Sequence, residues 1–443
     1  MNSNLVCIAV AIALQTQTAQ AQGDLLGADE MAETIVSMTS RVWTGPRTPI
    51  PEPVARPGGT LLDARSGRAL VALHADPGVS AETLRGAMGA LEEARARLGA
   101  MGWPGPIPDG ARGGGPELDL YLSGALPAGA HSDAMVSWSY LDRASAFAVV
   151  DPATPSSSLD ACVTEAYAEA LLLSLDPAEA RAWRRATAAW LTWEITGRLG
   201  CDEAVTQQQT EPHRSWISGA AGAGAGGALW LAHLSARHDG ARGRFLCDVW
   251  GLASQRTWEG AELRADPDLW SAIETAVNLS GDKLLDNVEE LAVLRWFVGR
   301  AHRDDVVVRA LDPDMRVPVS RTMTRLPTRI VGSPSLAPFG SAYVVMNGDT
   351  WNGHGRLRAW LRGEYGVHWS FVAVQLDADG SETARISAPP TGAEPKAYLP
   401  LQLHETTEQL LFVVTNLSDG LPDADEAEVH QRAFELIVDV ADD

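Results

Sequence analysis

The spacing of apolar and polar residues divides the chain into three parts. Up to residue 150, short apolar runs between turn residues predict strands, and one longer run predicts a helix with Ser80 as its N-cap. The strands are expected at residues 69–75, 117–122, 135–141 and 144–150, and the helix at residues 80–101. Together these elements predict a small mixed sheet.

The second part, from residue 159 to residue 300, has the spacing of consecutive helices. The helices are expected at residues 159–175, 178–199, 215–237, 241–255, 266–278 and 285–301. Asp176-Pro177 separates the first two, because proline is tolerated in the first turn of a helix but not in its interior.

The third part, beyond residue 304, alternates with period two and is divided by Asp-Gly, Asn-Gly and Pro-rich turns. Its strands are expected at residues 340–346, 355–362, 367–376, 382–386, 410–415 and 434–440. This spacing is typical of a β-sandwich. The predicted fold class is therefore α+β, with a small mixed sheet, a helical region and a C-terminal antiparallel β-sandwich.

The predicted organisation begins with a signal peptide, residues 1–21. Leu5–Leu14 is an apolar run, and Ala19-Gln20-Ala21 follows it as a small-x-small cleavage signal. The other predicted parts are a Pro-rich N-terminal segment at residues 22–66, an α+β domain at residues 67–304 and the sandwich at residues 305–443. Prolines 46, 49, 51, 53 and 57 favour an extended surface segment over a core element.

These features predict a secreted or periplasmic protein. No later stretch has the roughly 18 uninterrupted apolar residues of a membrane span, so no transmembrane anchor is expected. The 35 basic and 57 acidic residues give a net charge of −22, which excludes nucleic acid as a partner. The acidic run Asp419–Glu426 is a candidate calcium loop, but it lacks the EF-hand spacing, and a solvated turn is favoured.

Cleavage of the signal peptide would leave three cysteines, Cys162, Cys201 and Cys247, in an oxidising space. Cys162 opens one predicted helix and Cys201 ends the next, so antiparallel packing of the two favours a bridge between Cys162 and Cys201. A bridge from Cys201 to Cys247 and three buried free thiols are the alternatives.

A family resemblance rests on an order of elements. The strand Ser145–Val150 leads into a helix that contains Thr164-Glu165-Ala166-Tyr167-Ala168; a later helix carries Trp193-Glu194, and the sandwich follows. This order resembles that of secreted gluzincin-type putative zinc metallopeptidases with a C-terminal β-sandwich. In that family a His-Glu-x-x-His helix supplies two zinc ligands and a general base, and a later Glu supplies the third ligand.

The resemblance places Glu165 at the general-base position and Glu194 at the third-ligand position. Thr164 and Ala168 occupy the two histidine positions, so the zinc motif is missing and no metal ligand is assigned. Glu165 and Glu169, spaced i and i+4, could form an acid/base pair, although a surface or ion-paired role is favoured. Trp351, Trp360 and Trp369 are candidate binding aromatics in the sandwich.

The sequence therefore favours a non-catalytic protein, a pseudoenzyme on a gluzincin-like scaffold, that binds a protein or peptide partner. The alternatives are a zinc metallopeptidase with atypical ligands and a carbohydrate- or surface-binding protein that uses the sandwich. No cofactor is predicted, and zinc and calcium both stay open.

Overall fold

The computed structural model describes most of the chain beyond the N-terminal region. The described residues are 47–48, 53–68, 70–135, 143–216, 224–239, 244–254, 263–264, 267–300, 305–311, 314–331, 334–391, 395–418 and 431–441. The predicted signal peptide and the acidic run Asp419–Glu426 lie outside them.

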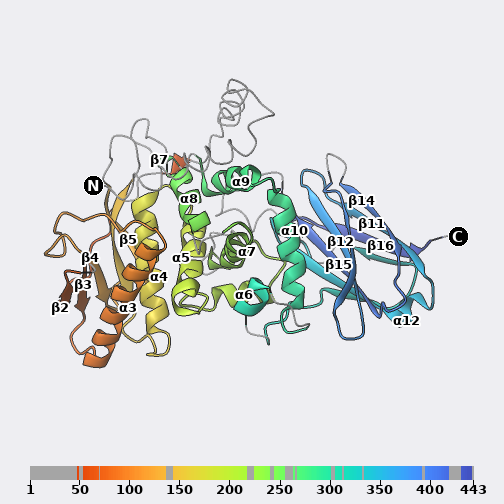
Figure 1. Ribbon diagram of the computed structural model, residues 1–443. Helices are drawn as coiled ribbons and strands as arrows, with labels where there is room; N and C mark the ends of the chain where they lie inside the picture. Colours follow the sequence, from red (N-terminus) through yellow and green to blue (C-terminus); the bar gives the residue numbers. More distant parts are fainter. Residues whose placement is uncertain are drawn as a thin grey trace, which may run out of the picture. The chain divides into compact units, whose positions relative to one another are not determined.

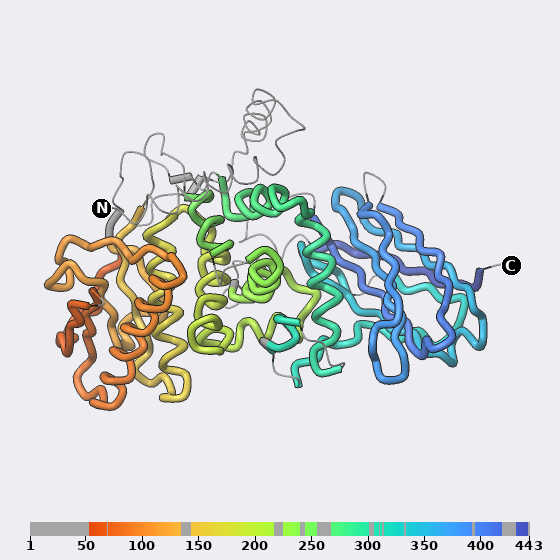
Figure 2. The backbone as a smooth tube through the Cα atoms, viewed as in Figure 1, coloured from red at the N-terminus to blue at the C-terminus, as the bar shows by residue number. Residues whose placement is uncertain are grey.

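The described residues belong to two compact units (Figures 1 and 2). The first unit is Met1–Ala180, Leu191–Thr196 and Arg237–Gly281, and the second is Arg181–Trp190, Gly197–Ala236 and Asp282–Asp443. The predicted division into domains at residue 304 stays a prediction.

The first unit contains a five-stranded mixed sheet in the order β2-β3-β4-β6-β5. Strands β3, β4 and β6 are parallel, whereas the edge strands β2 and β5 are antiparallel to their neighbours. The strands are β2 (Leu61–Ser66), β3 (Val71–Ala75), β4 (Leu118–Leu122), β5 (Gly129–Met135) and β6 (Ala144–Val150). The sequence pattern predicted β3, β4 and β6 but missed the more polar strands β2 and β5.

Helices α3 (Ala81–Ala100) and α4 (Leu159–Leu175) pack together beside the parallel strands (Figure 1). All seven residues of β6 are buried, which explains its uninterrupted apolar sequence. On the other side of the sheet, Tyr121, Phe147 and Val149 form a small apolar cluster. The partly buried Val54 packs against it. The segment before β2 therefore covers part of that face.

The elements outside these sheets are mostly short helices. They are β1 (Arg47–Thr48), α5 (Arg181–Thr196), α6 (Ala204–Thr210), η1 (Gly224–Gly227), α7 (Ala228–His238), α8 (Arg244–Ala253), β7 (Leu263–Arg264), α9 (Leu269–Leu279), α10 (Leu284–Leu294), η2 (Arg295–Phe297) and α11 (Val306–Ala310). Helix α9 begins where Asp268 caps it, with the Asp268 side chain accepting the Ser271 N–H at 2.9 Å.

The C-terminal part of the second unit is a sandwich of a five-stranded sheet, β13-β12-β15-β10-β8, and a four-stranded sheet, β14-β11-β16-β9. The elements are β8 (Arg321–Met323), β9 (Thr328–Val331), β10 (Ser341–Asn347), α12 (Gly348–Trp351), β11 (Arg356–Gly363), β12 (Trp369–Leu376), β13 (Glu382–Ala388), β14 (Lys396–Gln402), β15 (Gln409–Asn416) and β16 (Phe434–Val440). One pair departs from the predicted antiparallel arrangement, because β8 runs parallel to β10.

The three central strands of the five-stranded sheet, β12, β15 and β10, are buried on both faces. Along β12, Trp369, Phe371 and Ala373 face the core between the sheets. Val372, Val374 and Leu376 pack instead with residues of α10 and η2. Helix α10 therefore covers the outer side of this sheet (Figure 1), and the second unit has a helical layer and two sheets.

None of the described helices is both long and apolar enough to cross a bilayer.

Candidate functional site

Helix α4 carries the residues that the resemblance relates to a zinc motif. Every residue from Ala161 to Leu175 is buried. Thr164 is 1% exposed and Ala168 is 0% exposed. The two positions that correspond to zinc-binding histidines therefore contribute to the packed core of the first unit.

The two glutamates of α4 are also buried, and one has a structural contact. Glu169 accepts the Ala130 N–H of β5 through Oε2 at 3.0 Å, which ties the helix to the edge strand. Gly129 precedes this contact with φ +121, and a Cβ there would lie 2.8 Å from Glu169 Oε2. Because Glu169 makes this contact with the backbone of β5, we assign it a structural role. Burial also shows that, of the two favoured roles for Glu165 and Glu169, surface placement was wrong, while ion pairing stays a prediction.

Glu194 lies near the end of α5 and is exposed, whereas Glu165 is buried. Among the described residues, no group of three or more His, Cys, Asp or Glu side chains is arranged to hold a metal ion. The structure therefore gives no support to a joint ligand role for Glu165 and Glu194.

The cysteines follow the favoured prediction. Cys162 and Cys201 are disulfide-bonded, and Cys247 is a buried free thiol. A disulfide stabilises a fold mainly by restricting the unfolded chain, so this bridge is assigned a structural role.

A buried carboxyl group lies between α4 and α9. Glu179 accepts the Ala180 N–H at 2.8 Å and the Leu269 N–H at 2.6 Å, and the latter is one of the donors that the start of α9 leaves without a helical partner. Burial raises the pKa of Glu179 well above its ordinary value, and the negative charges of Asp176 and Asp268 raise it further.

We expect this carboxyl to make stability fall with rising pH. Its pKa is higher in the folded chain than its ordinary value of 4.5, so the folded state retains a proton that the unfolded state loses. The free energy of unfolding should therefore decrease as pH rises above about 4.5 toward the folded pKa. Urea titrations from about pH 5 to about pH 8 should give a flatter profile for Glu179→Gln than for the wild type.

The matched control for this experiment is Glu211→Gln. The Arg214 side chain lowers the pKa of Glu211, so Glu211 is ionised in both states over that interval and the slope should not change. Equal slopes for the wild type and Glu179→Gln would show that Glu179 titrates normally.

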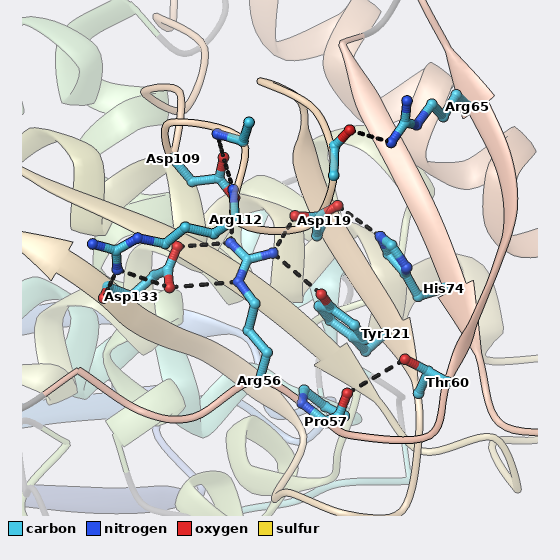
Figure 3. A network of polar contacts seen from close by, with 12 residues as sticks. Arg56, Pro57, Thr60, Arg65, His74, Asp109, Arg112, Asp119, Tyr121 and Asp133 are labelled. Carbon is cyan, nitrogen blue, oxygen red and sulfur yellow. Dashed lines mark hydrogen bonds and ion pairs between the residues drawn. The ribbon is translucent and has the colours of Figure 1, made fainter.

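A network of polar contacts surrounds Arg56, in the segment before β2 of the first unit (Figure 3). The Arg56 guanidinium pairs with Asp109, Asp119 and Asp133, with the Asp133 contact at 2.7 Å. It also donates to the Tyr121 hydroxyl at 3.2 Å. The three carboxylates come from a loop, from β4 and from β5, so this one side chain ties the N-terminal segment to three parts of the unit.

Two further side chains complete this cluster. His74 on β3 pairs through Nε2 with Asp119 Oδ1 at 2.7 Å and stacks on Tyr121 with ring centroids 4.6 Å apart. Arg112 donates to Asp133 Oδ1 at 3.2 Å. Asp119 is thus shared between Arg56 and His74, and Asp133 between Arg56 and Arg112. The three carboxylates together surround the Arg56 guanidinium.

Burial and ion pairing change the pKa values of the aspartates in this cluster in opposite directions. Burial raises the pKa of Asp109, and the positive charge of Arg56 only partly offsets this. Burial also acts to raise the pKa of Asp119, but the contacts with His74 and Arg56 outweigh it, and the pKa is lowered. The contacts with His74 and Arg56 thus favour the ionised form of Asp119, whereas burial disfavours that of Asp109.

The Pro-rich segment was predicted to be an extended surface segment, and Pro53, Ala55, Gly58 and Gly59 are indeed exposed. Pro57 is buried, however, and the Arg56 side chain is only 14% exposed, because Arg56 is the counterion of buried aspartates. The sequence did not identify this cluster in advance. The available signal was Asp119, a charge within the apolar run of β4, since a buried carboxylate requires a partner.

The candidate aromatics of the sandwich separate into two groups. Trp369 is 0% exposed and Trp351 is 7% exposed, and both pack in the core between the sheets. Neither is available to a surface ligand, which corrects the expectation for these two residues. Trp360 lies on the outer face of the four-stranded sheet and is partly exposed.

Comparisons with known proteins give likenesses among solved structures only. No family model matches the chain, and no curated protein matches it in sequence. Among solved structures, the chain is similar to the pre-peptidase C-terminal domain of a collagenase from Bacillus anthracis, at 16% identity and a TM-score of 0.19. That likeness covers 27% of this chain and 96% of the domain.

Proposed function

We propose that this chain is a secreted or periplasmic, non-catalytic protein that acts by binding a protein or peptide partner, on a scaffold related to that of the metallopeptidases. The observation that carries the proposal is the burial of Thr164 and Ala168 in α4. In a catalytic zinc site these positions would hold imidazoles that face a cleft with an open coordination position. Here they hold small side chains in the core.

The other polar residues of α4 support the same proposal. Glu169 is engaged with the backbone of β5, and Glu165 is 8% exposed. General-base catalysis requires a carboxylate that reaches a water molecule next to the substrate. The burial of α4 favours a role for this helix in stability.

Zinc binding and peptide hydrolysis test the proposal. The chain from residue 22 is treated with chelator and titrated with zinc by calorimetry, as wild type, Glu165→Gln and Glu194→Gln, and each protein is assayed on a mixed peptide substrate. We expect the three proteins to behave alike, with no hydrolysis. Stoichiometric zinc that either substitution removes, together with zinc-dependent hydrolysis, would overturn the proposal and establish the metallopeptidase alternative.

The carbohydrate alternative is weakened by the positions of the tryptophans. With Trp351 and Trp369 in the core, it rests on Trp360 and its neighbour Tyr398. The two rings are tilted by 42° and do not form a flat platform.

A further inference from the structure

We infer that residues 53–57, here called the strap, occupy the docking site of the proposed partner, and that the partner is a protein or peptide whose extended segment carries an arginine two residues after an apolar side chain. The strap precedes β2 and belongs to the first unit. The inference rests on the proposed function and adds to it a site and a chemical class of partner.

The strap lies on the sheet as an extended peptide would. Val54 and Arg56 are partly buried, whereas Pro53 and Ala55, which alternate with them, are exposed. The Val54 N–H donates to the Ser132 carbonyl of the edge strand β5 at 3.0 Å. Peptides that bind to the edge of a sheet use backbone contacts of this kind. The strap thus shows the orientation that a peptide ligand would take along β5.

The first side chain of the strap that faces the sheet contacts an apolar surface. Val54 packs against the cluster of Tyr121, Phe147 and Val149, which belong to β4 and β6. Burial of an aliphatic side chain on such a surface favours binding. A ligand therefore gains affinity from an apolar residue at this position.

The second side chain contacts groups that fit a guanidinium better than an ammonium (Figure 3). Arg56 Nε and Nη2 donate to the two carboxylate oxygens of Asp133 at 3.4 and 2.7 Å. The same guanidinium pairs with Asp109 and Asp119, and its carbon lies 5.2 Å from the centre of the Phe147 ring. Paired donors and a planar cation are properties of arginine that lysine lacks. The site is therefore selective for arginine.

The three carboxylates are also held by residues outside the strap. Asp119 pairs with His74 Nε2 at 2.7 Å, and Asp133 pairs with Arg112 at 3.2 Å. Asp109 accepts a backbone N–H of its own loop at 2.8 Å. Because none of these contacts involves the strap, we expect the site to keep its shape when another arginine replaces that of the strap.

A pair of glycines connects the strap to β2. Gly58 and Gly59 are exposed, and Gly59 has φ +80, in the left-handed region that favours glycine. A Cβ at either position would have no atom within 4 Å. The strap can therefore turn about this pair while β2 stays paired with β3.

Exchange of the strap for a partner segment avoids the cost of unpaired carboxylates. The arginine of the partner enters as Arg56 leaves, so Asp109, Asp119 and Asp133 have a guanidinium in both states. The advantage of the strap over the partner is its high effective concentration, since it is part of the same chain. A variant whose strap lacks the arginine should therefore bind a separate peptide more tightly than the wild type.

A peptide added in trans tests the inference with the chain from residue 22. The probe is a synthetic copy of residues 53–60 with an N-terminal fluorescein, and its anisotropy is followed as wild type or Arg56→Ala is added. We expect Arg56→Ala to bind the probe at least about tenfold more tightly than the wild type. Probes with lysine or citrulline in place of the arginine should bind Arg56→Ala at least about tenfold more weakly.

Two substitutions in the Arg56→Ala background test the site itself. Asp133→Asn removes the carboxylate that two guanidinium nitrogens contact, so the affinity for the probe should fall at least about tenfold. Asp63→Asn is the matched control, because Asp63 is an exposed carboxylate on β2 that Arg56 does not contact. It should change the affinity by less than about twofold.

A second strap variant keeps the test valid if Arg56→Ala does not fold, which thermal unfolding checks. Val54→Asn weakens the apolar contact of the strap without removing a charge. It should therefore also bind the probe more tightly than the wild type. An affinity equal to that of the wild type would count against a strap that can be exchanged.

A selection tests the chemical class of the partner. A phage-displayed library of random peptides is selected on Arg56→Ala, and enriched peptides are titrated against the same protein with and without Asp133→Asn. We expect enrichment of arginine two residues after valine, isoleucine or leucine. Enriched peptides without arginine, or with affinities that Asp133→Asn leaves unchanged, would overturn the assigned class.

Other results would overturn the inference as a whole. Equal affinities of Arg56→Ala and the wild type for the probe would show that the strap is a fixed part of the fold, while a binding function elsewhere would stay in place. Free arginine that binds as tightly as the probe would identify a small-molecule site. Self-association that Arg56→Ala abolishes would identify a second copy of the chain as the occupant. Zinc-dependent hydrolysis would instead overturn the proposed function itself.

Discussion

Replacement of Arg56 by alanine should lower the free energy of unfolding by about 3–5 kcal/mol, since it removes the counterion that three buried carboxylates share. Asp109, Asp119 and Asp133 are each at most 8% exposed, and Arg56 contacts all three. The removal of a cation from such a cluster leaves charges that water cannot reach. Urea unfolding followed by circular dichroism measures the difference.

The loss should also depend on pH in a way that a simple loss of packing does not. In Arg56→Ala, Asp109 and Asp119 can avoid the penalty by binding protons, so the destabilisation should shrink as pH falls toward about 4. Arg112→Ala is the control, because Arg112 contacts Asp133 but is 46% exposed, and its loss should be about 1 kcal/mol or less. Equal destabilisation by the two substitutions would show that Arg56 does not hold the segment to the sheet.

Replacement of Trp369 by alanine should lower the free energy of unfolding by about 3–5 kcal/mol, because it removes a tryptophan side chain from the inter-sheet core and leaves a cavity. Trp369 is 0% exposed, and its indole ring lies 6.1 Å from the Phe434 ring. Its indole N–H donates to the Glu364 carbonyl at 3.3 Å, and its backbone N–H donates to Thr391 Oγ1 at 2.8 Å. The substitution therefore removes both packing and a hydrogen bond of a buried indole.

Trp360→Ala is the matched control within the same sandwich. Trp360 lies on the outer side of β11, so its loss should lower the free energy of unfolding by less than about 1 kcal/mol. Chemical unfolding of both variants tests the difference. Similar losses for the two would contradict the assignment of one tryptophan to the core and the other to the outer face of the four-stranded sheet.

Several elements could be predicted from the chain because their determinants are local. Helix α4 spans Leu159–Leu175 as predicted, since Asp176-Pro177 ends it and apolar residues extend along its whole length. Strand β6 spans Ala144–Val150 as predicted from a continuous apolar run. In contrast, β14 was missed, because Pro400 and the charged Lys396 interrupt the pattern of a strand, and only its position at a sheet edge makes both tolerable.

The candidate sites could be predicted only in part. Glu165 and Glu194 were identified through a resemblance, and their environments, one buried and one exposed, became visible only in the folded chain. The partners of Arg56 lie between residues 109 and 133, and the strands of the four-stranded sheet begin at Thr328 and end at Val440. No spacing along the chain encodes contacts between residues so far apart.

The sequence by itself determined the fold class, the principal helices and strands and the net charge, because periodicity, helix breaks and composition act over short distances; it favoured the bridged pair of cysteines without excluding the alternatives. Only the tertiary structure decided that Cys162 and Cys201 are the bridged cysteines, which tryptophans are buried and which cation pairs with the aspartates of the first sheet. Those properties depend on strand order and register, which arise from packing between segments distant in the chain.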